Sequence, residues 1–430
     1  MPYTKVVIIG GGFGGLNAAK ALKKAQMEVI LIEKTNHHLF QPLLYQVATA
    51  ALSPGEIATP LREILRFQEN ASVLMGDVIS IDKKNQSVHL ANGDVISYDY
   101  LIIAPGARHS YFGNDTWETF APGLKTVQDA LKIRENVLIS FEIAERLDRI
   151  AEAEKFLNFV VIGGGPTGVE MAGAIAEVSQ HTLFKNFRRI KPERAKIYLV
   201  EALPHILPSY PESLALKAEK DLGKMGVRVI TGKKVTNITH EGVQIEDEFI
   251  PSRNVIWAAG NQAPPFLKSL DVPLDRAGRV IVEPDMSIPG FPEVFVIGDA
   301  AHAKDKDGKL LPGTAPTAIQ QAAYVAKIIR KQITKENRVP FKYFDKGSMA
   351  TIGRSKAVAT FGKLKFSGFI AWAAWCFIHI VYLIGFRNRF GVMLEWFYVF
   401  LTGQRGVRLI YRSIDPEMPK HFHKEAPETK

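Results

Sequence analysis

Two glycine-rich stretches decide the fold of this chain: "VVIIGGGFGGLNAAKAL" runs from Val6 to Leu22, and "VVIGGGPTGVEMAGAIAEV" runs from Val160 to Val178. In each, a β-branched run leads through Gly-x-Gly-x-x-Gly into a segment with helical spacing of its apolar residues. The glycines permit a tight turn, bring the backbone close to a pyrophosphate and let the helix pack against the strand. A chain that carries this turn twice is predicted to bind two dinucleotides.

The first turn is followed by the strand "MEVILIEK", which ends near Glu33. A carboxylate at this position accepts hydrogen bonds from the 2′-hydroxyl of an adenosine ribose. Strand, turn, helix, strand and acid therefore stand in the order of a dinucleotide-binding unit. The predicted contacts of this first clamp are Gly10, Gly12, Phe13, Gly14, Gly15, Glu33 and Lys34.

The second turn has its acid at Glu201, at the end of "AKIYLVEA". A carboxylate there repels a 2′-phosphate and favours NAD over NADP, although the insertion "SQHTLFKNFRRIKPER" before this strand carries three arginines. Glu170, in the first helical turn, is predicted to lie near a nicotinamide; the alternative is an acid favoured only by the helix dipole. The predicted contacts of the second clamp are Gly163, Gly165, Gly168, Glu201 and Gly260.

Three further stretches predict a flavin site. "EVFVIGDAAHA" ends a strand beside Asp299, whose carboxylate suits the ribityl hydroxyls and pyrophosphate of FAD. "YDYLIIAPGA" ends a strand at Ala104 and Gly106. "LMGDVISID", from Leu74 to Asp82, is interpreted as one crossing strand whose backbone at Val78 meets the adenine.

The composition bounds the chemistry. With 430 residues the chain is long enough for two or three domains. Its single cysteine, Cys376, excludes an internal disulfide, a Cys-x-x-Cys redox pair and a cysteine-based zinc cluster, so redox chemistry needs a bound cofactor. Adjacent His37 and His38 would face opposite sides of a strand, and we predict no metal site.

The net charge of +10 is concentrated near the C-terminus, where thirteen Lys or Arg but only two acidic residues lie between Lys327 and Arg389. Such a block suits nucleic acid, an acidic partner protein or an anionic membrane surface. The apolar stretch inside it, "FSGFIAWAAWCFIHIVYLIGF" from Phe366 to Phe386, favours the membrane. We therefore predict binding to anionic lipids and no binding of nucleic acid.

The apolar stretch has 21 residues, a length that permits a membrane span. Its tryptophans lie nearer the middle than the ends, whereas spanning helices prefer them at the ends. We expect a helix that lies in the membrane interface with one face on protein; a spanning helix and a buried core helix are the alternatives. Five residues are expected to share one helical face: Trp372, Trp375, His379, Tyr382 and Phe386.

These elements together resemble the two-dinucleotide-binding-domain flavoproteins and, among them, the type II, non-proton-pumping NADH:quinone oxidoreductases. The resemblance covers essentially the whole chain and rests on "HHLFQPLLYQVATAALSP" (His37 to Pro54), "WAAG" (Trp257 to Gly260) and "APTAIQQA" (Ala315 to Ala322). It implies FAD on the first clamp, NADH on the second, and quinone at Ala315, Ala318, Gln320 and Gln321. Pro316 stands where the family usually has a glutamine, so the role of that glutamine does not carry over.

The expected fold is α/β, with two Rossmann-like domains, the NAD domain inserted in the FAD domain, and a C-terminal helical membrane-docking segment. The expected boundaries are 1–125 and 262–345 for the FAD domain, 126–261 for the NAD domain and 346–430 for the C-terminal region. The expected reaction passes a hydride from NADH to the flavin and two electrons on to a membrane quinone, without ion pumping. Glu170, Gln320 and Gln321 are the expected catalytic residues.

The implied location is the cytoplasmic face of the inner cell membrane, as a peripheral or monotopic protein. A homodimer is left open, and His379 is either a proton donor to quinone or a packed histidine. The sequence also offers three other functions. A sulfide:quinone reductase would need reactive cysteines, a soluble reductase of an electron-transfer protein would give the apolar tail no purpose, and a flavin-bound NAD sensor would show no dependence on quinone.

Overall fold

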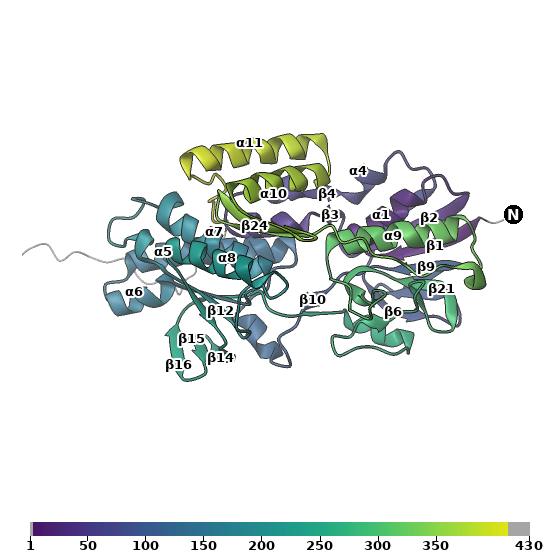
Figure 1. Ribbon diagram of the computed structural model, residues 1–430, viewed down its shortest axis with the longest axis horizontal. Coiled ribbons are helices and arrows are strands. Elements are labelled where there is room, and N and C mark those ends of the chain that lie inside the picture. The colour runs from purple at the N-terminus through teal and green to yellow at the C-terminus, as the bar shows by residue number, and fades with distance from the viewer. Residues whose placement is uncertain (1–2, 412–430) are drawn as a thin grey trace, which may run out of the picture. The chain divides into compact units, whose positions relative to one another are not determined.

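The computed structural model describes residues 3–411, which divide into two compact units (Figure 1). The first unit comprises the described residues of 1–39, 58–109 and 261–346, and the second those of 40–57, 110–260 and 347–430. These units cut the chain differently from the expected functional domains, because 40–57 and 110–125 cluster with the second unit. The functional division itself stays a prediction.

The first unit is built on a six-stranded sheet in the order β20-β21-β9-β1-β2-β5. The strands are β1 (Thr4–Ile9), β2 (Met27–Glu33), β5 (Ala71–Met75), β9 (Tyr100–Ile103), β20 (Ser287–Ile288) and β21 (Phe291–Val296). All pairs are parallel except β20 with β21. The last four residues of β1 are all buried, as expected for a parallel strand covered on both faces.

Two long helices of this unit are α1 (Phe13–Ala21) and α9 (Ala315–Arg330), which pack against each other (Figure 1). Pro316 lies in the first turn of α9, where its missing N–H is not needed. An antiparallel sheet of β6 (Val78–Asp82), β7 (Ser87–Leu90) and β8 (Val95–Ser97) follows β5 in the chain.

The stretch Leu74 to Asp82 is not the single crossing strand that the sequence suggested. Its first two residues end β5, and Val78 begins β6 in a different sheet, opposite Leu90. The break falls at Gly76, whose N–H donates to the carbonyl of Glu33 at 2.9 Å. This hydrogen bond follows the last β2–β5 pair, Glu33 with Met75, and the chain then passes to the second sheet.

The second unit repeats the parallel arrangement with four strands in the order β13-β12-β11-β17. The strands are β11 (Asn158–Ile162), β12 (Lys196–Glu201), β13 (Val227–Thr231) and β17 (Asn254–Trp257), accompanied by the helices α5 (Val127–Arg146), α6 (Ile150–Leu157), α7 (Pro166–Glu177) and α8 (Glu212–Lys224). Both units thus place their first strand between the second and the fourth, the strand order of a dinucleotide-binding fold.

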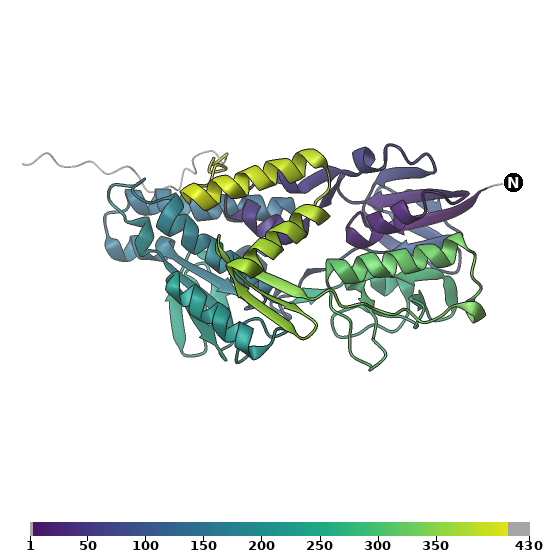
Figure 2. The ribbon, with the colours of Figure 1, turned by 45° about the horizontal axis from the view of Figure 1, so that its top comes forward.

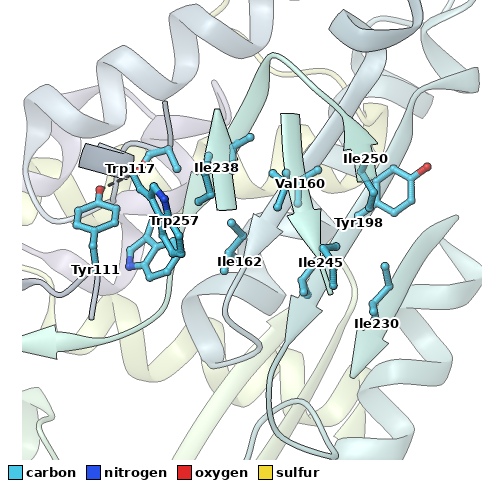
Figure 3. Close-up of a cluster of buried hydrophobic side chains, with 14 residues drawn as sticks. Tyr111, Trp117, Val160, Ile162, Tyr198, Ile230, Ile238, Ile245, Ile250 and Trp257 are labelled. Atoms are coloured by element: carbon cyan, nitrogen blue, oxygen red, sulfur yellow. Dashed lines mark hydrogen bonds between the residues drawn. The ribbon is translucent and has the colours of Figure 1, made fainter. Parts of the chain in front are cut away.

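One core of the second unit lies between this parallel sheet and an antiparallel ribbon, as Figure 3 shows. The ribbon is formed by β14 (Val235–Thr239), β15 (Gly242–Ile245) and β16 (Glu248–Pro251). At the edge of this core the Trp257 ring stacks on Tyr111 with 5.0 Å between ring centroids. The Nε1–H of Trp257 donates to the carbonyl of Ser110 at 2.9 Å. This packing fixes the end of β17, from which the chain passes to Gly260.

The C-terminal region forms a three-stranded antiparallel sheet and two helices, α10 and α11, which lie side by side (Figures 1 and 2). The elements are β23 (Ser348–Ile352), β24 (Lys356–Phe361), β25 (Leu364–Gly368), α10 (Phe369–Tyr382) and α11 (Phe386–Thr402). Within residues 3–411, none of the helices combines the length and the apolar character needed to cross a bilayer.

The apolar run from Phe366 to Phe386 is therefore not one helix. Its first residues pair with β24 as part of β25, and the run is interrupted at Gly385, which has φ +89°. Phe386 belongs to α11, so it does not share a helical face with Trp372 and Trp375. A left-handed backbone at Gly385 separates the two helices.

Several short strands and α-helices lie between these elements. They are β3 (His37–Leu39), α2 (Leu44–Ala48), α3 (Pro54–Ile57), β4 (Ala58–Pro60), α4 (Leu61–Leu65), β10 (Arg108–His109), β18 (Asn261–Gln262), β19 (Val280–Ile281) and β22 (Ala301–His302). The insertion between α7 and β12 holds a π-helical turn at Val178–Thr182 and a 3₁₀ turn at Pro192–Arg194.

Candidate active site

The two glycine turns are the same structure built twice. Gly10 and Gly163 have φ of +100° and +109°. A Cβ on Gly15 would lie 1.8 Å from the carbonyl oxygen of Gly10, and a Cβ on Gly168 would lie 1.8 Å from that of Gly163. These four positions require glycine, because the backbone angle or the neighbouring carbonyl excludes a side chain.

The remaining motif glycine of each turn is different. Gly12 and Gly165 have φ of −70° and −68°, values that any residue adopts, and a Cβ on either would meet nothing within 4 Å. Both glycines lie at the N-terminus of a helix, α1 or α7, where free backbone N–H groups favour an anion. Each turn therefore keeps open space where a pyrophosphate would approach the backbone.

The two acids have matching contacts that the sequence did not suggest. Glu33 accepts from the N–H of Gly11 at 2.5 Å and from that of Thr35 at 3.2 Å. Glu201 accepts from the N–H of Gly164 at 2.6 Å and from that of Leu203 at 2.8 Å. Each acid thus fastens the glycine turn of its own clamp to the end of the second strand.

His38 is a further residue of the first clamp that sequence analysis missed. Its Nδ1–H donates to the carbonyl of Gly11 at 2.9 Å, and its ring lies edge-on to Phe13 with 5.1 Å between centroids. Burial lowers the pKa of His38 to about 4, so the ring is neutral. Lys34, by contrast, is exposed and pairs with Asp77 at 2.8 Å.

A pocket in the first unit joins residues from separate predicted motifs. Asp299, Gly298, Pro312, Thr317 and Gln321 line it. The Gln321 side chain is buried and its Oε1 accepts from the N–H of Gly298 at 2.7 Å, which fixes the turn after β21. The structure therefore brings Asp299 and Gln321 together.

The following residues of the predicted motifs do not line this pocket. Gln320 does not line this pocket: its amide donates to the carbonyl of Phe344 at 2.9 Å and accepts from the N–H of Phe344 at 3.0 Å. Ala318 is buried on α9, Ala104 is buried at the end of β9, and Gly14 is buried in α1. Ala315 begins α9, while Gly106 and Gly260 adopt φ of +72° and +71° at their strand exits.

Glu170 lies on the wall of a second cavity, within the second unit. Tyr45, Gln46, Thr351 and Trp375 are among its neighbours there. Burial raises the pKa of Glu170 to about 8, although the N–H of Thr351, 3.3 Å from its Oε1, acts in the opposite direction. Glu170 thus keeps its proton at neutral pH. Tyr45 and Gln46 lie in the "LLYQVA" segment, but no spacing in the sequence points them at Glu170.

His379 and Cys376, both on α10, are packed groups. The His379 Nδ1–H donates to the carbonyl of Trp375 at 2.7 Å, and the two rings stack at 3.9 Å. Burial lowers the pKa of His379 to about 4, which disfavours a charged proton donor. Burial raises the pKa of the Cys376 thiol to about 12, so this thiol is a poor nucleophile. Within residues 3–411, no cluster of His, Cys, Asp and Glu could hold a metal ion.

Comparison with known proteins places this site in a family. Residues 4–322 match the family described as pyridine nucleotide-disulphide oxidoreductase, and residues 346–405 match the NDH2 C-terminal domain. The type II NADH:quinone oxidoreductase NdhA of Mycobacterium tuberculosis is 48% identical over 94% of this chain and 88% of its own length. Ndh of the same organism is 48% identical over 94% and 89%. The chain belongs to the type II NADH:quinone oxidoreductases.

The fold of this type II oxidoreductase also matches solved structures. NDH2 of Plasmodium falciparum in complex with NADH superposes with a TM-score of 0.86 and 21% identity, covering 94% of this chain and 99% of that one. The sulfide:quinone oxidoreductase of Aquifex aeolicus gives a TM-score of 0.73 and 21% identity, over 90% and 92%. The expected family and the α/β fold class are confirmed.

Proposed function

We propose that this protein oxidises NADH and reduces a membrane quinone through bound FAD, without pumping protons. The 48% identity to type II NADH:quinone oxidoreductases over nearly the whole chain carries this proposal. The overall reaction takes up NADH, a proton and quinone, and releases NAD⁺ and quinol. The packed Cys376 gives no support to a sulfide:quinone reductase, which would need reactive cysteines.

FAD and NADH are assigned to the first and second clamps. The open space at Gly12, the anion-favouring start of α1 and the carboxylates of Glu33 and Asp299 suit the phosphates, ribose and ribityl chain of FAD. Bound FAD supplies the redox chemistry, accepting a hydride from NADH and giving two electrons to quinone. Gly165 and Glu201 offer NADH the matching space and acid in the second unit.

Glu170 is assigned the role of a proton donor. Quinone takes up two protons on becoming quinol, and a carboxyl with a pKa of about 8 still carries its proton at pH 7. Ala315, Ala318 and Gln321 remain the proposed quinone contacts of the first unit. Gln320 is proposed to act there indirectly, because its side chain holds the backbone of Phe344.

The C-terminal helices are assigned to docking on the cytoplasmic membrane surface. Large apolar side chains of α10 and α11 are exposed, among them Phe377, Phe386 and Phe397. An isolated soluble domain rarely exposes so many together. Lys363, just before β25, and Arg387, in the first turn of α11, suit anionic lipid headgroups. Whether the protein is a homodimer is tested by measuring the mass of the detergent-solubilised protein.

The experiment compares wild type with Glu170→Gln in steady-state NADH oxidation, using a water-soluble quinone or ferricyanide as the acceptor. We expect the quinone rate of wild type to fall as pH rises through about 8, because Glu170 loses its proton. In Glu170→Gln the quinone rate falls about a hundredfold and this limb of the pH profile disappears. The ferricyanide rate, which needs no proton, stays unchanged.

Glu142→Gln is the matched control, because burial also raises the pKa of this carboxyl on α5. It should leave both rates and the pH profile unchanged. An unaltered quinone rate in Glu170→Gln would remove Glu170 from the mechanism. Equal NADH oxidation with and without quinone would remove the proposed function itself.

A further inference from the structure

A series of hydrogen bonds leads inward from the C-terminal helix α11. The indole Nε1–H of Trp396 donates to Oε1 of Gln46 at 2.7 Å. The amide Nε2–H of Gln46 then donates to the hydroxyl oxygen of Tyr45 at 3.0 Å. Two adjacent residues of α2 are thereby connected to α11, 350 positions away from Gln46 in the sequence.

The same series continues to Glu170. The hydroxyl of Tyr45 lies 3.0 Å from Oγ1 of Thr351, and the backbone N–H of Thr351 donates to Oε1 of Glu170 at 3.3 Å. The Tyr45 oxygen accepts from Gln46 and still has its own proton and a second lone pair for the bond to Thr351. Either of the two hydroxyls can donate in the bond between Tyr45 and Thr351, and the series connects α11 to β23 and Glu170 in both cases.

The three side chains between Trp396 and Glu170 are buried, which makes each bond consequential. Tyr45, Gln46 and Thr351 are all among the buried residues. Removing one partner leaves a buried polar atom without a hydrogen bond, a larger loss than the bond itself contributes. Burial raises the pKa of Tyr45 further above its usual range, so its hydroxyl stays neutral.

Other charged or titratable groups also surround Glu170, and they are already engaged. Arg405 pairs with Glu177 at 2.8 Å and donates to the carbonyl of Thr49 at 2.7 Å. The backbone N–H of Arg354 donates to Glu177 at 2.7 Å. Cys376 completes the titratable groups of this cavity wall in the described chain. Burial and, to a lesser degree, the charge of Glu170 raise the pKa of Tyr210.

We propose that Trp396, Gln46 and Tyr45 are positioning residues, which hold the Thr351 amide against the Glu170 carboxyl so that α11 sets the surroundings of this acid. The proposal rests on the proposed function for its consequence in catalysis, but the hydrogen-bond series is independent of it. On α11, Trp396 turns inward while the next residue, Phe397, is exposed. A helix assigned to the membrane surface therefore also supports the acid of the cavity.

The test replaces Trp396 by Phe, which keeps an aromatic ring and removes the N–H. The purified full-length protein with FAD is titrated by infrared spectroscopy, with the Glu170 carboxyl band assigned by its loss in Glu170→Gln. We expect the titration midpoint of Glu170 to rise by about half a pH unit to one pH unit, the effect of one weakened neutral hydrogen bond. Tyr45→Phe should produce a shift in the same direction.

Trp372→Phe is the matched control, because it removes the same indole N–H from α10, where the ring stacks on Phe400 at 5.4 Å. Its midpoint should equal that of wild type. A double variant, Trp396→Phe with Gln46→Leu, should shift no further than Gln46→Leu alone, since Trp396 acts on the series through Gln46.

The outcomes separate this proposal from the proposed function. An unshifted midpoint in both Trp396→Phe and Tyr45→Phe, or an equal shift in Trp372→Phe, would overturn the positioning role. A shifted midpoint supports it, whatever the activity does. If the midpoint shifts while the pH profile of the quinone rate stays fixed, the positioning role stands and the proton-donor role of Glu170 fails.

Discussion

Gly12 and Gly165 are glycines that neither their backbone angles nor their neighbours require. Gly15 and Gly168 are glycines because a Cβ would collide with the carbonyl of the preceding strand end. At the residue scale, the same motif therefore contains positions that serve the fold and positions that leave room for a ligand. Substitution by alanine should separate the two.

Gly12→Ala should fold normally and lose FAD affinity, whereas Gly15→Ala should lose stability as well. The physical reason is that an added methyl at Gly12 enters open space, while one at Gly15 would lie 1.8 Å from the carbonyl oxygen of Gly10. Flavin absorbance per protein measures the first effect, and the urea midpoint by far-UV circular dichroism measures the second. Gly165→Ala is the control, since it should keep FAD and raise the KM for NADH. A Gly12→Ala protein with full FAD content would contradict this assignment.

The two glutamines of the quinone motif show where prediction from sequence ends at this scale. The motif predicts the same role for Gln320 and Gln321. In the structure, however, Gln321 is hydrogen-bonded to Gly298 in the pocket and Gln320 to Phe344. Consecutive positions of a helix point in directions about 100° apart. Which of them faces the pocket depends on where the chain around Phe344 packs against α9. A contact between residues so far apart in the sequence leaves no local pattern.

At the scale of elements, the sequence predicted the strands and helices of both clamps because each has a strong local signal. β2 and β12 end at the expected acids. The C-terminal helix was predicted too long because a run of apolar residues does not show where a paired strand ends and a helix begins. The first residues of the run, 366–368, pair with β24 as part of β25 instead of starting the helix.

Asp285 ties the element β20 to the chain that follows α9. Lys335 donates to one carboxylate oxygen at 2.7 Å, and Arg338 to the other at 2.9 Å. Burial opposes ionisation of Asp285, but the hydrogen bonds from Lys335, Ser287 and Arg338 outweigh it and lower the pKa to about 2. Because the pKa is lower in the folded state, the stabilisation is present above about pH 4 and is lost as pH falls toward 2.

Asp285→Asn should therefore lower the free energy of unfolding by about 2 kcal/mol at pH 7. The difference from wild type should shrink below pH 4 as the native carboxyl takes up its proton. Urea unfolding at pH 7, 5 and 3 measures it. The exposed Asp94→Asn serves as control and should change stability by less than about 0.5 kcal/mol. A difference that stays constant between pH 7 and pH 3 would show that the carboxylate charge is not the cause.

At the scale of the whole molecule, sequence and structure agree on a repeated plan and differ on how the chain is divided. Both units place a glycine turn after the first strand of a parallel sheet with the same strand order. The segment 40–57 nevertheless clusters with the second unit, where Tyr45 and Gln46 contact Thr351 and Trp396. Such contacts join residues about 300 positions apart, so local periodicity could not predict them.

The exposed apolar side chains of α10 and α11 give the last prediction. Phe377, Phe386 and Phe397 are 71%, 85% and 63% exposed. Replacing all three by serine should weaken binding to vesicles of anionic lipid about a hundredfold, since each ring loses roughly 1 kcal/mol of partial burial in the bilayer. Vesicle co-sedimentation measures the affinity, and the NADH-to-ferricyanide rate should stay unchanged because no clamp residue is altered.

Phe67→Ser, at a residue 73% exposed in the first unit, is the control and should bind as wild type does. Raising the salt to 1 M should weaken wild-type binding only in part, because salt screens the contribution of Lys363 and Arg387 but leaves the burial of the rings. Unchanged sedimentation of the triple variant would mean that another surface of the protein meets the membrane.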